Sequence, residues 1–202
     1  MAKTKNDNNG WQIVAYVAIA VILVSLLVLG MRLTGYAIES TGIVRVNISS
    51  TAAINFTSNL INFGNGTVNP GKPSATLESN ATAAVDGDWT WTAQHFILEN
   101  VGNTNVALNL KTNQDATGFL GGTSPAYQYS VNDYNTETGS CGTPLVTLEG
   151  WNTVSTIGTD ICTSFPFTDA NDQIQIDVRL VIPSDASPGE LSDTFTATGT
   201  AI

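Results

Sequence analysis

The chain has 202 residues and a formal net charge of −10, from 7 Lys and Arg against 17 Asp and Glu. This acidic balance argues against a nucleic-acid binder, which clusters basic side chains along phosphates. One histidine and two cysteines cannot build a multi-histidine metal site or a four-cysteine zinc site. Only 12% of the residues are charged, about half the usual share, and Thr, Asn and Ser supply the remaining polarity. That composition is typical of exported β-rich proteins.

One long apolar run lies near the N-terminus. No charge occurs between Asp7 and Arg32, and a helix over residues 11–31 would be about 31 Å long, which matches a bilayer core. Lys3 and Lys5 precede the run, so the positive-inside rule places the N-terminus inside and the C-terminus outside. We therefore predict a cytoplasmic tail over 1–10, a transmembrane anchor or signal helix over 11–32, a linker over 33–42 and an extracellular domain over 43–202.

The sequence leaves three fates open for this helix. Its length favours a retained anchor, because the apolar part of a cleaved signal peptide usually has about 7–15 residues. Gly35 and Ala37 offer small side chains for signal-peptide cleavage after Ala37, and a prepilin-type signal would be cut after Gly10. We expect a protein of the cell envelope: a single-pass membrane protein with an extracellular C-terminal domain, or a secreted one if it is cleaved after Ala37.

The exported part shows the period-2 alternation of half-buried strands and almost no helical periodicity. The alternating runs are 43–48, 53–57, 89–98, 105–111, 173–182 and 193–202. Turn residues separate them at 65–66, 69–71, 101–103, 121–122 and 187–189. This pattern predicts an all-β fold, an antiparallel β-sandwich of the jelly-roll or Ig-like type. We expect long loops and short edge strands over 113–172.

The two cysteines, Cys141 and Cys162, both lie in that less regular segment. In an oxidising exterior they should form a disulfide that stabilises the fold by about 3 kcal/mol. Two unpaired buried thiols are the alternative. A redox-catalytic pair is disfavoured because such cysteines usually stand two residues apart.

Four Asn-x-Ser/Thr sequons make the protein a candidate glycoprotein, at Asn47, Asn55, Asn65 and Asn80. The first two asparagines occupy the polar faces of their predicted strands, and Asn65 lies in a turn. All are therefore expected at the surface, where a glycan can be attached.

The search for catalytic motifs gives no catalytic residue, and we expect no enzyme. His95 lies in a predicted strand on the same face as Trp89 and Trp91, where a packed strand histidine is the plain interpretation. There is no Gly-x-Ser-x-Gly nucleophile elbow, and Gly118–Gly122 lacks the Lys-Ser/Thr of a phosphate loop. The two tryptophans are core residues or a stacking platform for sugars.

Acidic turns supply the one cofactor candidate. Asp169, Asn171 and Asp172 form a cluster of hard oxygen ligands that suits Ca²⁺, and Asp86 and Asp88 form another acidic pair. Solvated turn acids are the alternative, since the spacing matches no complete EF-hand loop.

Three segments together resemble a known family. They are 63–71 (FGNGTVNPG), 98–103 (LENVGN) leading into VALNL, and 182–189 before a Thr-rich last strand. Over about residues 40–202 the chain resembles exported β-sandwich surface proteins of the TasA/camelysin type, including archaeal relatives that form filaments. The resemblance implies polymerisation by donation of an N-terminal strand, for which Gly42–Ser49 is the candidate. The long apolar helix departs from this pattern, because a retained anchor would tie the subunit to a membrane.

These observations predict a non-enzymatic extracellular surface protein with a structural or adhesive role. It would contact the membrane through residues 11–32 and associate with itself or with other cell-surface proteins, but not with nucleic acid. A pilus-like filament subunit that assembles by strand donation is included in this prediction. The alternative is an extracellular glycan- or Ca²⁺-binding module.

Overall fold

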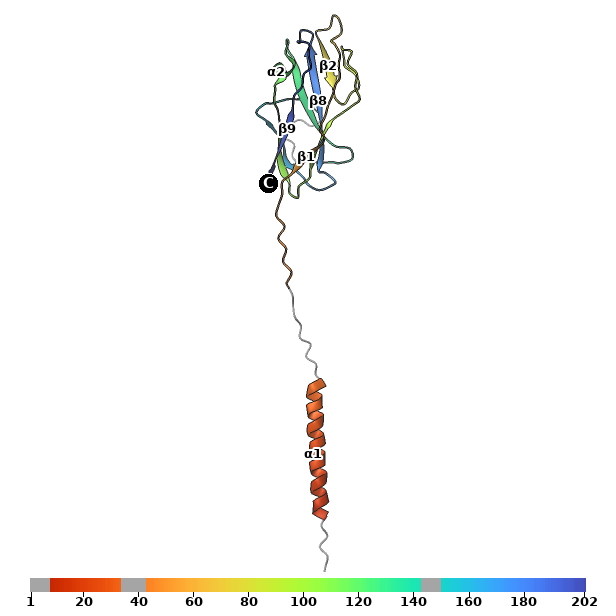
Figure 1. The fold of residues 1–202 in the computed structure, drawn as a ribbon, viewed down its shortest axis with the longest axis vertical. Coiled ribbons are helices and arrows are strands. Elements are labelled where there is room, and N and C mark those ends of the chain that lie inside the picture. Colours follow the sequence, from red (N-terminus) through yellow and green to blue (C-terminus); the bar gives the residue numbers. More distant parts are fainter. Residues whose placement is uncertain (1–7, 34–42, 143–149) are drawn as a thin grey trace, which may run out of the picture. The chain divides into compact units, whose positions relative to one another are not determined.

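The computed structural model describes residues 8–33, 43–142 and 150–202 (Figure 1). The chain divides into two compact units, residues 1–47 and residues 48–202. The second unit, called the β domain below, begins five residues later than the predicted domain. Ala37 and nearly all of the predicted linker lie outside the described residues, so the cleavage prediction stays a prediction.

The first unit contains helix α1, Asn8–Leu33, which includes the helix predicted over 11–32. Within it, Gly10–Leu29 is long and apolar enough to cross a membrane, and none of this stretch is buried by protein. Ser25 Oγ donates to the carbonyl oxygen of Val21 at 2.7 Å, so its hydroxyl is satisfied inside the helix. A membrane anchor and a signal sequence both fit such a helix.

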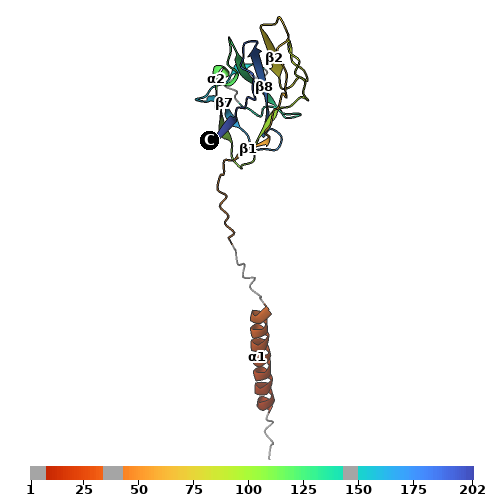
Figure 2. The same cartoon turned by 45° about the horizontal axis from the view of Figure 1, so that its top comes forward.

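The β domain consists of two antiparallel sheets, which confirms the prediction of an antiparallel, mostly β fold (Figures 1 and 2). The larger sheet has the order β1-β3-β8-β5-β6, and β2 also pairs with β8. Its strands are β1 (Ile54–Ser58), β2 (Ser74–Glu78), β3 (Phe96–Asn100), β5 (Ala126–Asp133), β6 (Asn152–Thr153) and β8 (Gln173–Pro183). The smaller sheet has the order β7-β4-β9, with β4 (Val106–Thr112), β7 (Thr159–Phe165) and β9 (Phe195–Ala201). A short helix α2, Ala116–Leu120, precedes β5.

One hydrophobic core joins the two sheets, and β8 is its main contributor. Alternate side chains of this strand are buried, from Ile174 to Leu180, because successive residues of a strand point to opposite faces. Tyr129 of β5 and Leu108 of β4 are buried in the same cluster. Each such side chain stabilises the fold by about 1.5–3 kcal/mol when it is fully buried.

Several predicted strands are found near their expected bounds, and others differ. Runs 53–57, 105–111, 173–182 and 193–202 correspond to β1, β4, β8 and β9. The run 89–98 is a strand only from Phe96 onward, and 43–48 joins no described strand although its sequence alternates. The segment 113–172 holds the edge strands β6 and β7, as expected, but it also holds β5, an interior strand that pairs with β8 over eight residues.

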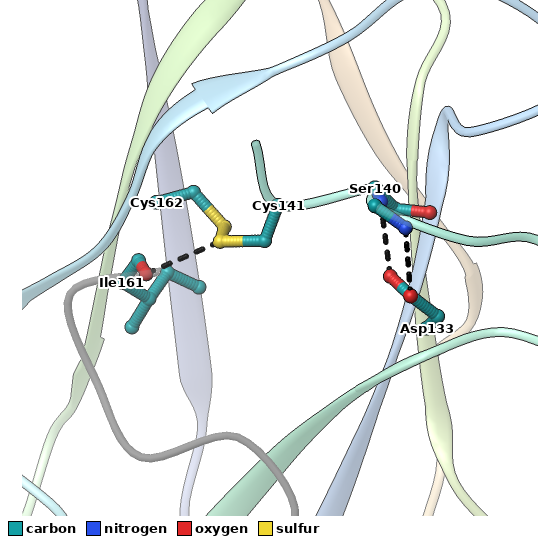
Figure 3. The surroundings of a disulfide bond; sticks show 6 residues. Asp133, Ser140, Cys141, Ile161 and Cys162 are labelled. Atoms are coloured by element: carbon teal, nitrogen blue, oxygen red, sulfur yellow. Dashed lines mark hydrogen bonds between the residues drawn. A yellow bond between two sulfur atoms is a disulfide. The ribbon is translucent and has the colours of Figure 1, made fainter. Parts of the chain in front are cut away.

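The disulfide predicted from the sequence is present (Figure 3). Cys141 and Cys162 are bonded, with a Cα–Cα distance of 5.3 Å, and both are buried. Beside it, the Asp133 carboxylate accepts hydrogen bonds from the backbone N–H groups of Gly139 and Ser140, at 2.8 and 2.9 Å. The bond therefore links the turn after β5 in the larger sheet to β7 in the smaller sheet.

Removal of this bond should destabilise the β domain. The double variant Cys141→Ser/Cys162→Ser should lower the free energy of unfolding by about 3 kcal/mol, because the cysteines are 21 residues apart and the unfolded chain gains a free loop. Urea denaturation of the variant and of the oxidised and reduced wild type measures this. Reductant should leave the variant unchanged, and equal stability of all three samples would contradict the prediction.

Candidate functional site

His95 is paired with a buried carboxylate. Its Nδ1 lies 3.1 Å from Oδ1 of Asp177, whose side chain is 1% exposed. Asn132 and Gln175 also donate to this carboxylate from their amide nitrogens, at 3.0–3.2 Å. Ser58 Oγ donates to the backbone oxygen of His95 and not to the ring, so it is not arranged as the nucleophile of a Ser-His-Asp site.

The same face of the larger sheet carries an arginine and a tryptophan. Arg179 lies opposite Glu78 on β2 and Gln128 on β5, and its Nε is 3.5 Å from Glu78 Oε1. Its guanidinium lies over the ring of Trp151, 5.8 Å from the ring centroid. We define the outer-face cluster as His95, Asn132, Trp151, Gln175, Asp177 and Arg179.

The opposite, inner face of the larger sheet borders a groove of about 1360 Å³. Leu77, Phe96 and Ile182 line it from the larger sheet, and Phe195 lines it from β9. Loops 60–72 and 183–193 form its two sides, where Leu60 and Leu191 are 67% and 46% exposed. The groove is therefore a concavity that solvent can reach, with apolar side chains from the two sheets and polar and charged side chains, such as Lys72 and Glu190, from the loops.

The smaller sheet ends at a strand edge, and Phe195 at the start of that strand lines the groove. β9 is the terminal strand of the smaller sheet, and β4 is its sole hydrogen-bonded partner among the described strands. On the other edge of β9, alternate residues direct backbone N–H and C=O groups away from β4, and Ile54 of β1 packs near Gly199. Such an edge can pair with another strand.

The aromatic wall of the groove is uncharged. Burial raises the pKa of Tyr127 far above its usual value of 10, and the Asp193 carboxylate raises it further. Tyr127 also stacks edge-on against Phe195, with ring centroids 5.8 Å apart. The phenol therefore stays neutral, and the aromatic side chains form an uncharged part of the groove wall at the start of β9.

The segment before the β domain is extended and solvent-exposed. Val44, Val46 and Ile48 have 78–95% of their surface exposed, and they alternate with the polar Arg45 and Asn47. Asn103 fixes the chain just after this segment. Its backbone N–H donates to Thr51 O, and its side-chain Nδ2 donates to Ser49 O, both at 3.0 Å.

The predicted calcium ligands differ in burial, and the calcium site stays a prediction. Asp169 is exposed, and Asp172 is buried. The Asn171 side-chain oxygen accepts a hydrogen bond from the Thr168 hydroxyl. Within the described ranges, no three His, Cys, Asp or Glu side chains are placed to hold a metal ion.

The other acidic pair, Asp86 and Asp88, has structural partners. Asp86 forms an ion pair with Lys72 at 2.8 Å. The Asp88 carboxylate accepts hydrogen bonds from the backbone and the hydroxyl of Thr67. Both carboxylates thus fix turns in the loops around β2.

The two tryptophans pack against the hydrophobic core. Trp89 and Trp91 are both partly buried there, and Phe63 meets Trp91 edge-on at 5.0 Å between centroids. Gly66 and Gly87 lie against the Trp89 ring, where a side chain would clash. This packing favours the core interpretation over the sugar platform.

All four sequons are accessible. Asn47, Asn55, Asn65 and Asn80 are exposed, and so is the Ser or Thr two residues after each of them. Asn55 lies on β1 and points away from the core, as the alternation predicts. Glycan attachment at these positions stays a prediction.

Sequence reasoning missed Trp151, Arg179 and the groove. Arg179 is one of the polar residues of the alternating run 173–182, but its neighbours come from β2 and from the residue before β6. A stronger signal was present for β5, whose sequence AYQYSVND alternates Tyr127, Tyr129 and Val131 with polar residues. The groove has no signal in the sequence, because it depends on how far the smaller sheet extends.

Comparisons with known proteins give no relative. No family model matches the chain, and no curated protein or solved structure matches it. The resemblance to TasA/camelysin-type proteins thus stays a prediction from the sequence segments that carry it.

Glu137 should make stability depend on pH. Partial burial raises its pKa above the usual 4.5, with smaller contributions from Asp172 and Asp133, although hydrogen bonds from the Gln173 N–H and the Ser140 hydroxyl oppose the shift. The folded chain therefore binds this proton more tightly than the unfolded chain. This contribution to stability is fully present below pH 4.5 and is lost as the pH rises through the folded pKa.

The variant Glu137→Gln isolates this effect. Relative to the wild type, its free energy of unfolding should rise between about pH 4 and about pH 7, because the wild type alone loses the protonated group. Urea denaturation at both pH values measures the difference. A difference that does not change with pH, or that changes in the opposite direction, would contradict the prediction.

Proposed function

We propose that this is a non-enzymatic extracellular surface protein that self-associates by β-strand addition. Residues 43–48 of one copy, within the predicted donor Gly42–Ser49, add to the β9 edge of another copy. The observation that carries the proposal is the coexistence of an exposed, alternating apolar segment and a terminal strand, β9, that has one hydrogen-bonded partner among the described strands and meets a groove at Phe195. Strand addition uses main-chain hydrogen bonds for affinity and alternate side chains for specificity.

The donor segment has the pattern that such an edge requires. In an extended chain, Val44, Val46 and Ile48 point to one side, and Arg45 and Asn47 point to the other. The apolar side chains would enter the groove, and the polar ones would face solvent. A shift of one residue would reverse the two sides, so the pattern also selects the register.

The acceptor matches the donor in length and chemistry. β9 has seven residues, or about 23 Å, and the six residues from 43 to 48 span about 20 Å. The exposed leucines at the sides of the groove, Leu60 and Leu191, would lose solvent contact when a strand covers them. Burial of apolar surface would therefore add to the hydrogen bonds of the new strand pair.

Location follows from two features of the chain. The apolar helix supports attachment to a membrane, and the disulfide supports an oxidising compartment outside the cytoplasm. We propose that α1 is a retained anchor and that the two sheets form a β-sandwich of the jelly-roll or Ig-like type. The family resemblance adds filament formation as the expected form of assembly.

Point variants test the donor segment and the acceptor site separately. Val46→Asp should abolish self-association, because its side chain would meet the apolar side chains of the groove, and Leu60→Asp should weaken it at the acceptor. Light scattering of the full chain in detergent micelles, over a range of concentrations, measures the assembled fraction. The protein is made in a host that adds no glycans, so that glycans at the sequons cannot alter self-association.

Matched variants control for the added charge. Asn47→Asp adds the same charge on the solvent side of the donor, and Ile157→Asp replaces a 93% exposed aliphatic residue that does not line the groove. Both should associate like the wild type. Equal association of all four variants, or a wild type that stays monomeric at every concentration, would overturn the proposal.

The fate of α1 has its own test. Mass spectrometry with N-terminal peptide mapping of the protein from its native cells should give a chain that begins at Met1 or Ala2. That result is expected because α1 is long enough to remain as an anchor. A chain that begins at Ile38 would contradict the anchor and indicate a secreted subunit.

A further inference from the structure

We propose that the outer-face cluster binds a short neutral oligosaccharide. This inference does not depend on self-association, because the cluster lies on the face of the larger sheet opposite the groove. Residues 175, 177 and 179 alternate with the buried side chains of β8 and therefore point outward. From Gln175 to Arg179 the strand extends about 13 Å, which gives a linear surface.

The polar half of the cluster is held in fixed positions. Asp177 is buried, and its carboxylate accepts from Gln175, Asn132 and His95 at 3.0–3.2 Å. Each of these three partners keeps a further hydrogen-bonding atom. Asn132 and Gln175 each keep a side-chain amide oxygen, and His95 keeps Nε2. Sugar hydroxyls both donate and accept, so they suit such a mixed set. Side chains that are already ordered lose little entropy when a ligand binds.

The other half of the cluster joins an aromatic ring to unused donors. Trp151 is partly buried and carries the Arg179 guanidinium 5.8 Å from its ring centroid. Arg179 Nε is buried 3.5 Å from Glu78 Oε1, so the donors that a ligand could reach are the terminal N–H groups of the guanidinium. A guanidinium has five N–H donors, which gives this one capacity for ligand oxygens. An indole beside polar groups is a common surface for the C–H faces of sugars.

The charges of this face and of the whole domain favour a neutral ligand. Arg179 is close to Glu78, and Asp177 is close to His95, so these two acids have basic neighbours, and Glu99 on the same face adds a further negative charge. The chain from residue 38 onward has 4 basic and 16 acidic side chains, and this negative field disfavours anionic ligands. Among the described residues of this face, no three acidic side chains are placed together to hold a cation. Polyhydroxyl compounds without charge remain as the ligand class that fits.

The test uses the full chain in micelles of a detergent that has no sugar headgroup. Cellohexaose, chitohexaose and mannohexaose are the probes, and isothermal titration calorimetry with saturation-transfer NMR measures binding. We expect at least one probe to bind the wild type. Trp151→Ala and Arg179→Lys should each weaken that binding about tenfold, because the first removes the ring and the second removes the planar fork of donors.

Two controls make the result specific. Phe167→Ala removes a 41% exposed aromatic residue from another loop, and Leu60→Asp alters the groove; both should bind sugar like the wild type. If Trp151→Ala does not fold, as judged by thermal unfolding, Arg179→Lys decides the outcome. Absence of binding for all three probes, or equal binding by the wild type and the cluster variants, would overturn this proposal without affecting the proposal of strand addition.

Discussion

The two-faced pattern of β8 is the constraint on which the β domain depends. This strand pairs with β5 on one side and with β3 and β2 in succession on the other. Its inward residues, from Ile174 to Leu180, form the middle of the core. A charge in that row would lose its hydration inside a close-packed interior, which is costly. The outward row is under no such demand and is therefore free to carry polar side chains.

The two sheets differ in extent, and this difference creates the groove. Six strands make the larger sheet and three make the smaller one. Part of the inner apolar face of the larger sheet is therefore lined by loops and not by a strand. Soluble proteins usually cover such surfaces and protect their strand edges, because exposed ones promote association. The edge of β9 is the physical basis of the assembly that we propose.

The fold could be predicted from the sequence where the period-2 alternation was strong, whereas the candidate functional sites could not be predicted. β8 and β4 could be read from alternation alone, because the buried row of each is continuous in sequence. The segment 43–48 has the same alternation but no strand partner within the described part of the chain, because pairing depends on a neighbour and not on pattern. Likewise, Trp89 and Trp91 could be core or surface until their packing against Gly66, Gly87 and Phe63 was known.

The outer-face cluster illustrates a further limit. His95 and Asp177 are 82 residues apart in sequence. Arg179 on β8 lies over the ring of Trp151, which precedes β6, and β5 runs between these two strands. Sheet register brings these side chains together, and one sequence without relatives contains no record of that register. Composition and local pattern did indicate a β-rich domain with a disulfide and polar outer strand faces, because these features follow from local residue types.

The disulfide also has a mechanical consequence for a protein held at one end. A load that enters near the N-terminus and leaves through the last strand must pull the two sheets apart. Because Cys141 and Cys162 are in covalent contact, the 21-residue interval between them cannot lengthen. An extended chain would otherwise gain about 70 Å from that interval. The bond thus reduces the maximum length that the chain can reach under tension. It also keeps the turn after β5 attached to β7 even when hydrogen bonds between strands have broken.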